Sequence, residues 1–241
     1  MSRMDGAALQ CRDFVKRHDL DAYLGTLLNP ETEQPRLFAV WAIAADALRL
    51  PWSATEPTMA MIRLQWWRDA LEAGEGHPAL VHLAGRETLP LIRHLDATER
   101  LHGAPFDDPD EAKAWARHTF LPLMHALAGT EEGGDTPEMG NLAALHGLVL
   151  LLRRAAFPRR SGLPLLADEK AVEEVKTRAA ALAGGGRLRC RQAPWLPFAL
   201  SRRWMRAIMN MPPEELSKRP PELAQWRRQI FLMRCRLTWR F

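Results

Sequence analysis

The segment from Leu142 to Ala156, LAALHGLVLLLRRAA, is apolar around almost its whole circumference when it is drawn as a helix. A helix without a polar face has to be enclosed by other elements, so this segment predicts the centre of a helical bundle. The rest of the chain is rich in Ala, Leu, Arg, Met and Glu and has few alternating β-branched runs. The sequence therefore predicts an all-α fold of about eight to ten helices.

The length and composition fit one domain. With 241 residues the chain can bury one sizeable core, and we expect a single domain over residues 1–241. No stretch approaches the ~18 uninterrupted apolar residues of a membrane span. The N-terminus lacks the apolar core of a secretion signal, and the three cysteines have no metal-ligand spacing. These features favour a cytoplasmic protein with reduced thiols and without a metal or cofactor.

Prolines predict the ends of the first helices. A helical stretch over 7–28 should break near Asp19, and a second over 35–50 should stop at Pro51, because proline disfavours helix in the residue before it. Towards the C-terminus we expect two further helices at about 195–210 and 221–239.

A third helix is predicted to begin at Pro57, with the hydroxyl of Thr55 as its cap. Met59, Ile62 and Trp66 recur at helical spacing and are predicted to form its apolar stripe.

The string Asp107 to Glu111, DDPDE, has the density of acids seen in metal-binding prenyl transferases. Pro109 cannot lie in the middle of a helix, so these acids cannot line up one turn apart. We interpret the string as a helix start, with Asp108 as the cap and the following acids complementing the helix dipole.

Two segments in the N-terminal half carry a resemblance to a known family. LFAVWAIAADAL at 37–48 and IRLQWWRDALEAGEGHPAL at 62–80 resemble the squalene/phytoene synthases, in which an FALYAF-type helix precedes an LxxWRxxL helix and a His-Pro pair. The matching positions are Phe38, Ala39, Trp41, Ala42, Leu64, Trp67, Arg68, Leu71, His77 and Pro78.

The C-terminal half adds looser matches. LLRR at 151–154 is similar to the family's LLR segment, and residues 157–164 are similar to the turn that follows it. The segments at 194–208 and 219–223 resemble a short bacterial branch that includes relatives of a mitochondrial complex I assembly factor. The resemblance implies the isoprenoid synthase fold.

The resemblance also implies a magnesium-dependent joining of two prenyl diphosphates, and here the sequence departs from the family. Magnesium needs clustered oxygen ligands, which the family supplies as aspartate pairs on two facing helices. Counting from Phe38, the first pair falls near Leu48, Arg49 and Trp52, none of which is acidic. Asp46 remains, and with Arg49 three residues on it predicts an ion pair rather than a metal ligand.

The second expected aspartate pair is missing as well. Residues 154–158, Arg-Ala-Ala-Phe-Pro, stand where the acids should follow the LLR segment.

Other catalytic motifs are absent from the sequence as well, namely GxSxG, the P-loop, GxGxxG and HExxH, and His118 and His125 have no acid between them. His146, on the apolar central helix, predicts a hydrogen-bonded core histidine.

Two sets of residues are candidates for binding. If the family's cavity persists, the predicted ligand pocket contains Asp46, Arg68, His146, Arg153 and Arg160. From residue 187 onward the chain carries 13 Lys/Arg against 3 Asp/Glu, interleaved with tryptophans, which is typical of a membrane interface or a surface for an acidic partner. The predicted surface comprises Arg202, Arg203, Trp204, Arg227, Arg228 and Trp239.

Three functional hypotheses remain open at this point. The first, from the resemblance, is a non-catalytic protein that assists respiratory complex I assembly at an inner membrane, or on its matrix side if the protein is mitochondrial. The second is an active prenyl transferase, which would require Mg²⁺, and the third is a polyprenyl lipid binder. The partners would be complex I subunits, an anionic membrane surface or a prenyl lipid; nucleic acid is not expected, because no recognised binding motif is present.

Overall fold

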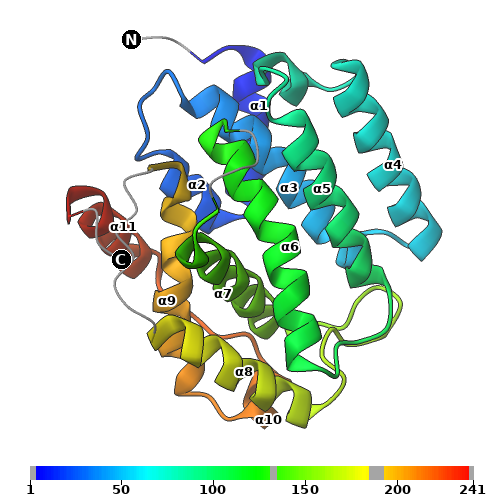
Figure 1. Cartoon of the computed structure of the whole chain (residues 1–241), viewed down its shortest axis with the longest axis vertical. Coiled ribbons are helices and arrows are strands. Elements are labelled where there is room, and N and C mark those ends of the chain that lie inside the picture. The colour runs from blue at the N-terminus through cyan, green and yellow to red at the C-terminus, as the bar shows by residue number, and fades with distance from the viewer. Residues whose placement is uncertain (1–3, 131–134, 185–192, 239–241) are drawn as a thin grey trace.

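The structure is a computed structural model that describes residues 4–130, 135–184 and 193–238 (Figure 1). Over these ranges its regular elements are helices joined by turns and loops, and the β-type pairing is a single isolated bridge between Phe106 and Leu166, which confirms the all-α prediction. The α-helices are α1 (Gly6–His18), α2 (Leu20–Thr26), α3 (Gln34–Ser53), α4 (Pro57–Ala73), α5 (Thr88–Thr98), α6 (Pro109–Ala128), α7 (Pro137–Arg154), α8 (Glu169–Gly184), α9 (Leu196–Met209), α10 (Pro213–Leu216) and α11 (Gln225–Thr238). The short 3-10 helices are η1 (Pro78–His82), η2 (Glu99–His102) and η3 (Ala193–Trp195).

The apolar helix α7 lies at the centre, as predicted. It packs against α6, α8 and α9 (Figure 1). Leu148, Leu151 and Leu152 are fully buried. Helices α6 and α7 approach closely because position 147 is glycine: a Cβ there would lie 2.4 Å from the Cβ of Ala116. The central contact of the bundle therefore depends on the absence of a side chain at Gly147.

The first helical stretch breaks where the sequence predicted. Asp19 separates α1 from α2, and its Oδ1 accepts the backbone N–H of Ala22 at 2.9 Å, so it caps α2. The predicted stop at Pro51 is wrong, because α3 continues to Ser53. Pro51 falls in the last turn, where the missing N–H removes only one helical bond, and the N–H of Ala54 still bonds Leu50 at 3.0 Å.

The apolar stripe predicted for α4 is not the face that the helix buries, although Trp66, one of its three residues, packs partly against the core. Met59 and Ile62 are 52% and 57% exposed. The buried side chains of the helix are Ala60, Leu64, Trp67, Ala70 and Leu71. Helix α4 lies at the edge of the bundle and packs mainly on α3, α5 and η2.

Two predicted helix starts have different outcomes. Helix α4 begins at Pro57 as expected, but Glu56 occupies the cap position without a side-chain bond, so Thr55 is not the cap. Helix α6 begins at Pro109, and Asp108 caps it by accepting the N–H of Asp110 at 2.8 Å. The DDPDE string is therefore a helix start, as predicted.

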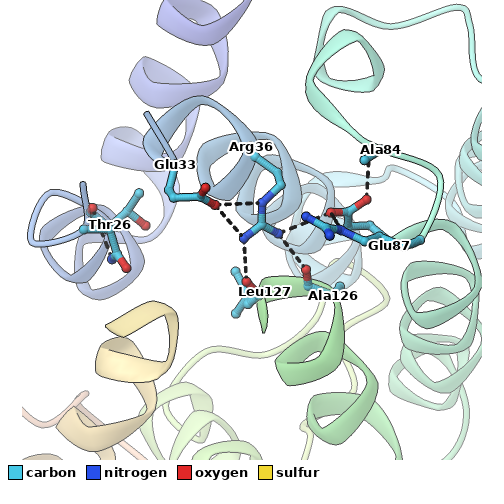
Figure 2. A network of polar contacts seen from close by, with 9 residues as sticks. Thr26, Glu33, Arg36, Ala84, Glu87, Ala126 and Leu127 are labelled. Carbon is cyan, nitrogen blue, oxygen red and sulfur yellow. Dashed lines mark hydrogen bonds and ion pairs between the residues drawn. The ribbon is translucent and has the colours of Figure 1, made fainter. Parts of the chain in front are cut away.

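A buried ion pair between Arg36 and Glu87 joins α3, α5 and α6 (Figure 2). Glu87 is fully buried, and its second oxygen accepts the N–H of Ala84 at 2.9 Å. Arg36 also donates to the carbonyls of Ala126 at 3.0 Å and Leu127 at 2.9 Å, in the last turn of α6, where carbonyls lack the regular helical bond to a residue four positions on. No helix in the described ranges is long and apolar enough to span a bilayer.

Candidate functional site

Asp21 lies at the junction of four helices and is 3% exposed. Its Oδ2 accepts Nη1 of Arg153 at 2.9 Å and the indole N–H of Trp204 at 2.7 Å. Its Oδ1 accepts Nη1 of Arg228 at 3.1 Å. Because these partners come from α7, α9 and α11, one carboxylate on α2 ties together elements from both ends of the chain.

Asp46 has the same kind of environment on α3 and is 2% exposed. Its Oδ2 accepts the indole N–H of Trp67 at 2.8 Å and Nε of Arg63 at 3.0 Å, while Arg49 contacts its Oδ1 at 2.7 Å. Burial alone would raise the pKa of Asp46, but the hydrogen bonds from Trp67, Arg63 and Arg49 outweigh it and lower the pKa. The predicted Asp46–Arg49 ion pair is therefore present, and a second arginine joins it.

These carboxylates do not fit the magnesium that the fold family implies. Magnesium in such sites is held by carboxylate and phosphate oxygens in octahedral geometry. Both oxygens of Asp21 and Asp46 already accept bonds from arginine, and Asp19 uses Oδ1 to cap α2. In the described ranges no three His, Cys, Asp or Glu side chains gather as a metal site would require. A magnesium ion that bound either Asp21 or Asp46 would have to displace an arginine guanidinium group from the carboxylate.

Arg68 and Arg160, two of the five residues predicted to share a pocket, are bound to other parts of the fold, as are Asp46 through Trp67 and Arg153 through Asp21. Arg68 lies between α4 and the α5–η2 segment and pairs with Asp96 at 2.7 Å and with Glu99. Arg160 is exposed beyond α7 and donates its backbone N–H to the carbonyl of Pro51 at 2.8 Å. The structure does not bring either guanidinium to Arg153.

His146 is held among aromatic rings on α7. Its Nδ1 lies 2.9 Å from Oγ of Ser201, and its ring is 4.7 Å from that of Phe120 and 4.5 Å from that of Phe198. Burial first, and then the charge of Arg153, lowers the pKa of His146 to about 3. A neutral, hydrogen-bonded histidine in this position packs as part of the core.

His125 on α6 forms a histidine–carboxylate pair that the spacing of the sequence did not predict. Nε2 of His125 is 2.6 Å from Oδ1 of Asp135, which lies just before α7, and Nδ1 of His125 is 3.3 Å from Thr130. A hollow of about 400 Å³ adjoins this pair and is also lined by Arg117 and His118. No acid lies between His118 and His125 in the sequence, and the acid that pairs with His125 is Asp135, which follows α6.

A larger groove lies between α8, α9 and α11, with a volume of about 1180 Å³. Its lining residues include Arg202, Arg203, Arg206, Arg227 and Arg234, together with Met209, Trp226, Ile230 and Phe231. No Asp or Glu of the described ranges belongs to this lining. We call it the C-terminal groove.

The predicted basic surface divides between this groove and the interior. Arg202, Arg203 and Arg227 line the groove. Trp204 is 3% exposed, and Arg228 bonds Asp21 and the carbonyl of Leu223, so these two residues hold the bundle together instead of facing a partner. Trp239 lies outside the described residues.

The comparisons with known proteins agree with this fold. A family model described as squalene/phytoene synthase matches residues 15–129. The chain is 27% identical over 181 residues to a Drosophila melanogaster protein named NADH dehydrogenase (ubiquinone) complex I, assembly factor 6 homolog, covering 66% of this chain and 54% of that one. A Rattus norvegicus protein named complex I assembly factor 6 is 23% identical, covering 62% and 49%. The chain thus spans about half the length of the curated relatives it matches.

Two solved structures share the arrangement of the helices. A dehydrosqualene synthase in complex with ligand superposes with a TM-score of 0.71 at 14% identity, over 95% of this chain and 94% of the other. Squalene synthase HpnC from Alicyclobacillus acidocaldarius gives a TM-score of 0.56 at 15% identity, over 97% and 94%. The chain is therefore similar to the squalene/phytoene synthase family over residues 15–129, and it shares the fold of the two synthase structures over nearly all of its length.

Proposed function

We propose that this chain is a non-catalytic protein of the squalene/phytoene synthase fold that assists the assembly of respiratory complex I at a membrane surface. The names of the Drosophila and rat relatives support this role. The place of action would be the inner membrane, on its matrix side if the protein is mitochondrial, with peripheral attachment.

The observation that carries the proposal is the state of Asp46. It is the acid left beside the first family motif, and two arginines and an indole N–H occupy its oxygens. Ionising a prenyl diphosphate requires cations that neutralise the departing diphosphate, and clustered carboxylates must hold those cations. A carboxylate neutralised by protein guanidinium groups supports the packing of α3 on α4 instead.

The environment of Asp21 supports the same conclusion. Arg153, the arginine of the LLR segment, points its guanidinium at Asp21 and lies over the ring of Trp204. An arginine held in this way stabilises the contacts among α2, α7 and α9. The interior thus supports a rigid scaffold whose outer surfaces bind partners.

A gene deletion in the source organism, read by native gel electrophoresis and complex I activity, tests the role. We expect reduced mature complex I, stalled intermediates, and restoration by the wild-type chain. A tagged chain recovered from native membranes should bring complex I subunits with it. Normal complex I in the deletion strain, together with the loss of a C30 or C40 prenyl product, would overturn the proposal in favour of an active transferase.

A further inference from the structure

Helix α11 presents an apolar stripe on its exposed side. Trp226, Ile230, Met233 and Leu237 are 57%, 54%, 47% and 82% exposed. They are successively four, three and four residues apart, which is the spacing of the a and d positions in a helix–helix seam. The inward side of the same helix is occupied by other residues, since Leu232 and Cys235 are buried in the core.

Arginines flank this stripe on the side of the C-terminal groove. Arg227 and Arg234 each directly follow a member of the stripe, and both line the groove together with Trp226 and Ile230. In a helix–helix seam these are the flanking positions whose charges select the partner. Arg203 and Arg206 line the groove from α9, so positive charge lies on two of its walls.

The shape of the surface favours a helix over a small molecule or a flat bilayer. The volume of about 1180 Å³ exceeds the ~300–1,000 Å³ of typical small-ligand pockets. A hollow beside an exposed, heptad-spaced stripe is the geometry in which an amphipathic helix buries its apolar face. A planar membrane surface would contact α11 and leave the hollow beside it unfilled.

We propose that the C-terminal groove and the α11 stripe bind an acidic amphipathic helix of a partner protein. Its apolar face packs along Trp226, Ile230, Met233 and Leu237, and its acidic flank lies against Arg227 and Arg234. Residues 187–241 carry 13 Lys/Arg against 3 Asp/Glu, so the surrounding field also attracts an acidic segment. This inference rests on the proposed function, because it names the kind of partner that the assembly role would use.

The test measures fluorescence anisotropy of a labelled peptide of several heptads, with Leu at a and d and Glu at e and g, added to the whole chain. We expect saturable binding that weakens with salt, and no binding of a peptide of the same composition in scrambled order. Joint Arg227→Glu and Arg234→Glu substitution should weaken binding by about tenfold or more, which corresponds to ~1.4 kcal/mol. Arg17→Glu, an exposed charge reversal on α1, should leave it unchanged.

Ile230→Asp should abolish binding, and Ile62→Asp is its matched control. Both isoleucines lie on helices and are similarly exposed, at 54% and 57%, but Ile62 is on α4. Equal effects of the two substitutions would overturn the proposal. Failure of the wild-type chain to bind the peptide would overturn it as well. If the chain instead binds vesicles of phosphatidylcholine and phosphatidylglycerol in a way that depends on Ile230, and does not bind the peptide, the surface binds a membrane and the proposal is wrong.

The docking inference and the assembly role fail in different ways. If the peptide does not bind, the docking inference is wrong even when complex I requires the protein. If the peptide binds through Ile230 and complex I assembles normally without the protein, the docking site stands and the assembly role is wrong.

Discussion

Trp204 donates its indole N–H to Asp21 at 2.7 Å while arginines lie against its ring. The guanidinium carbon of Arg153 is 3.9 Å from the ring centroid, and that of Arg228 is 4.7 Å from it. Both arginines also bond the same carboxylate. Charge neutralisation, hydrogen bonding and cation–π contact thus converge on one buried aspartate.

Replacing Asp21 with asparagine should destabilise the protein by about 3 kcal/mol or more. The change leaves the guanidinium groups of Arg153 and Arg228 without their counter-charge in a mostly buried site. Urea unfolding of both proteins measures the loss. Asp69→Asn, an exposed acid on α4, should change stability by less than about 0.5 kcal/mol, and equal effects of the two substitutions would contradict the role of Asp21.

Asp46 should make stability depend on pH in the acid range. Its folded pKa is below its unfolded value of about 3.9, so its contribution is present above that value and is lost as the pH falls through the folded pKa. The difference in unfolding free energy between the wild type and Asp46→Asn should therefore be largest near neutral pH and shrink below about pH 4. A difference that stays constant, or grows on acidification, would rule out this ionised pair.

Protonation of His94 should reduce the stability of the protein on acidification, and it should do so at a higher pH than protonation of Asp46. Burial lowers the pKa of His94 to about 4, and its Nδ1 lies 2.8 Å from the carbonyl of Thr119. The unfolded residue titrates near 6.5, so the contribution of His94 to stability falls by up to about 1.4 kcal/mol per pH unit on acidification between these values.

Chemical unfolding between about pH 7 and pH 5 tests the contribution of His94. His94→Gln should reduce the slope of stability against pH relative to the wild type. His118→Gln, on the exposed side of α6, should not reduce it. A wild-type slope that persists in His94→Gln would show that the buried histidine is not its source.

Gly147→Ala should destabilise the contact between α6 and α7. The new Cβ would meet the Cβ of Ala116 at 2.4 Å and the Phe120 ring at 3.0 Å. Overpacking of this kind costs about 1–3 kcal/mol, which opposes the ~1 kcal/mol that alanine gains in helix propensity. Thermal unfolding should show a lower Tm. Gly6→Ala, with nothing within 4 Å of its new Cβ, should not lower it, and a Tm for Gly147→Ala at or above the wild type would contradict the close approach.

The fold could be predicted from the sequence where a single property dominated. The uniform apolarity of 142–156 placed α7 at the centre, and Pro109 after Asp108 marked the start of α6. The orientation of α4 could not be predicted in the same way, because this helix carries apolar residues on two faces. The packed face includes Ala60 and Ala70, whose small side chains permit close approach but add little to a hydrophobic pattern.

The candidate site was predictable only where its residues are close in the chain. Asp46 and Arg49 are three residues apart, a spacing that brings side chains together on any helix. The partners of Asp21 are 132, 183 and 207 residues away, so no local spacing could identify them. Composition predicted a surface role for Trp204 and Arg228 because it does not distinguish the inward from the outward face of α9 and α11.

The most direct test of the account is an assay of diphosphate release with the purified chain, Mg²⁺ and farnesyl or geranylgeranyl diphosphate. Because arginines neutralise Asp21 and Asp46, we predict no release above the rate without protein and no C30 or C40 product. Protein-dependent diphosphate release accompanied by either product would contradict the account.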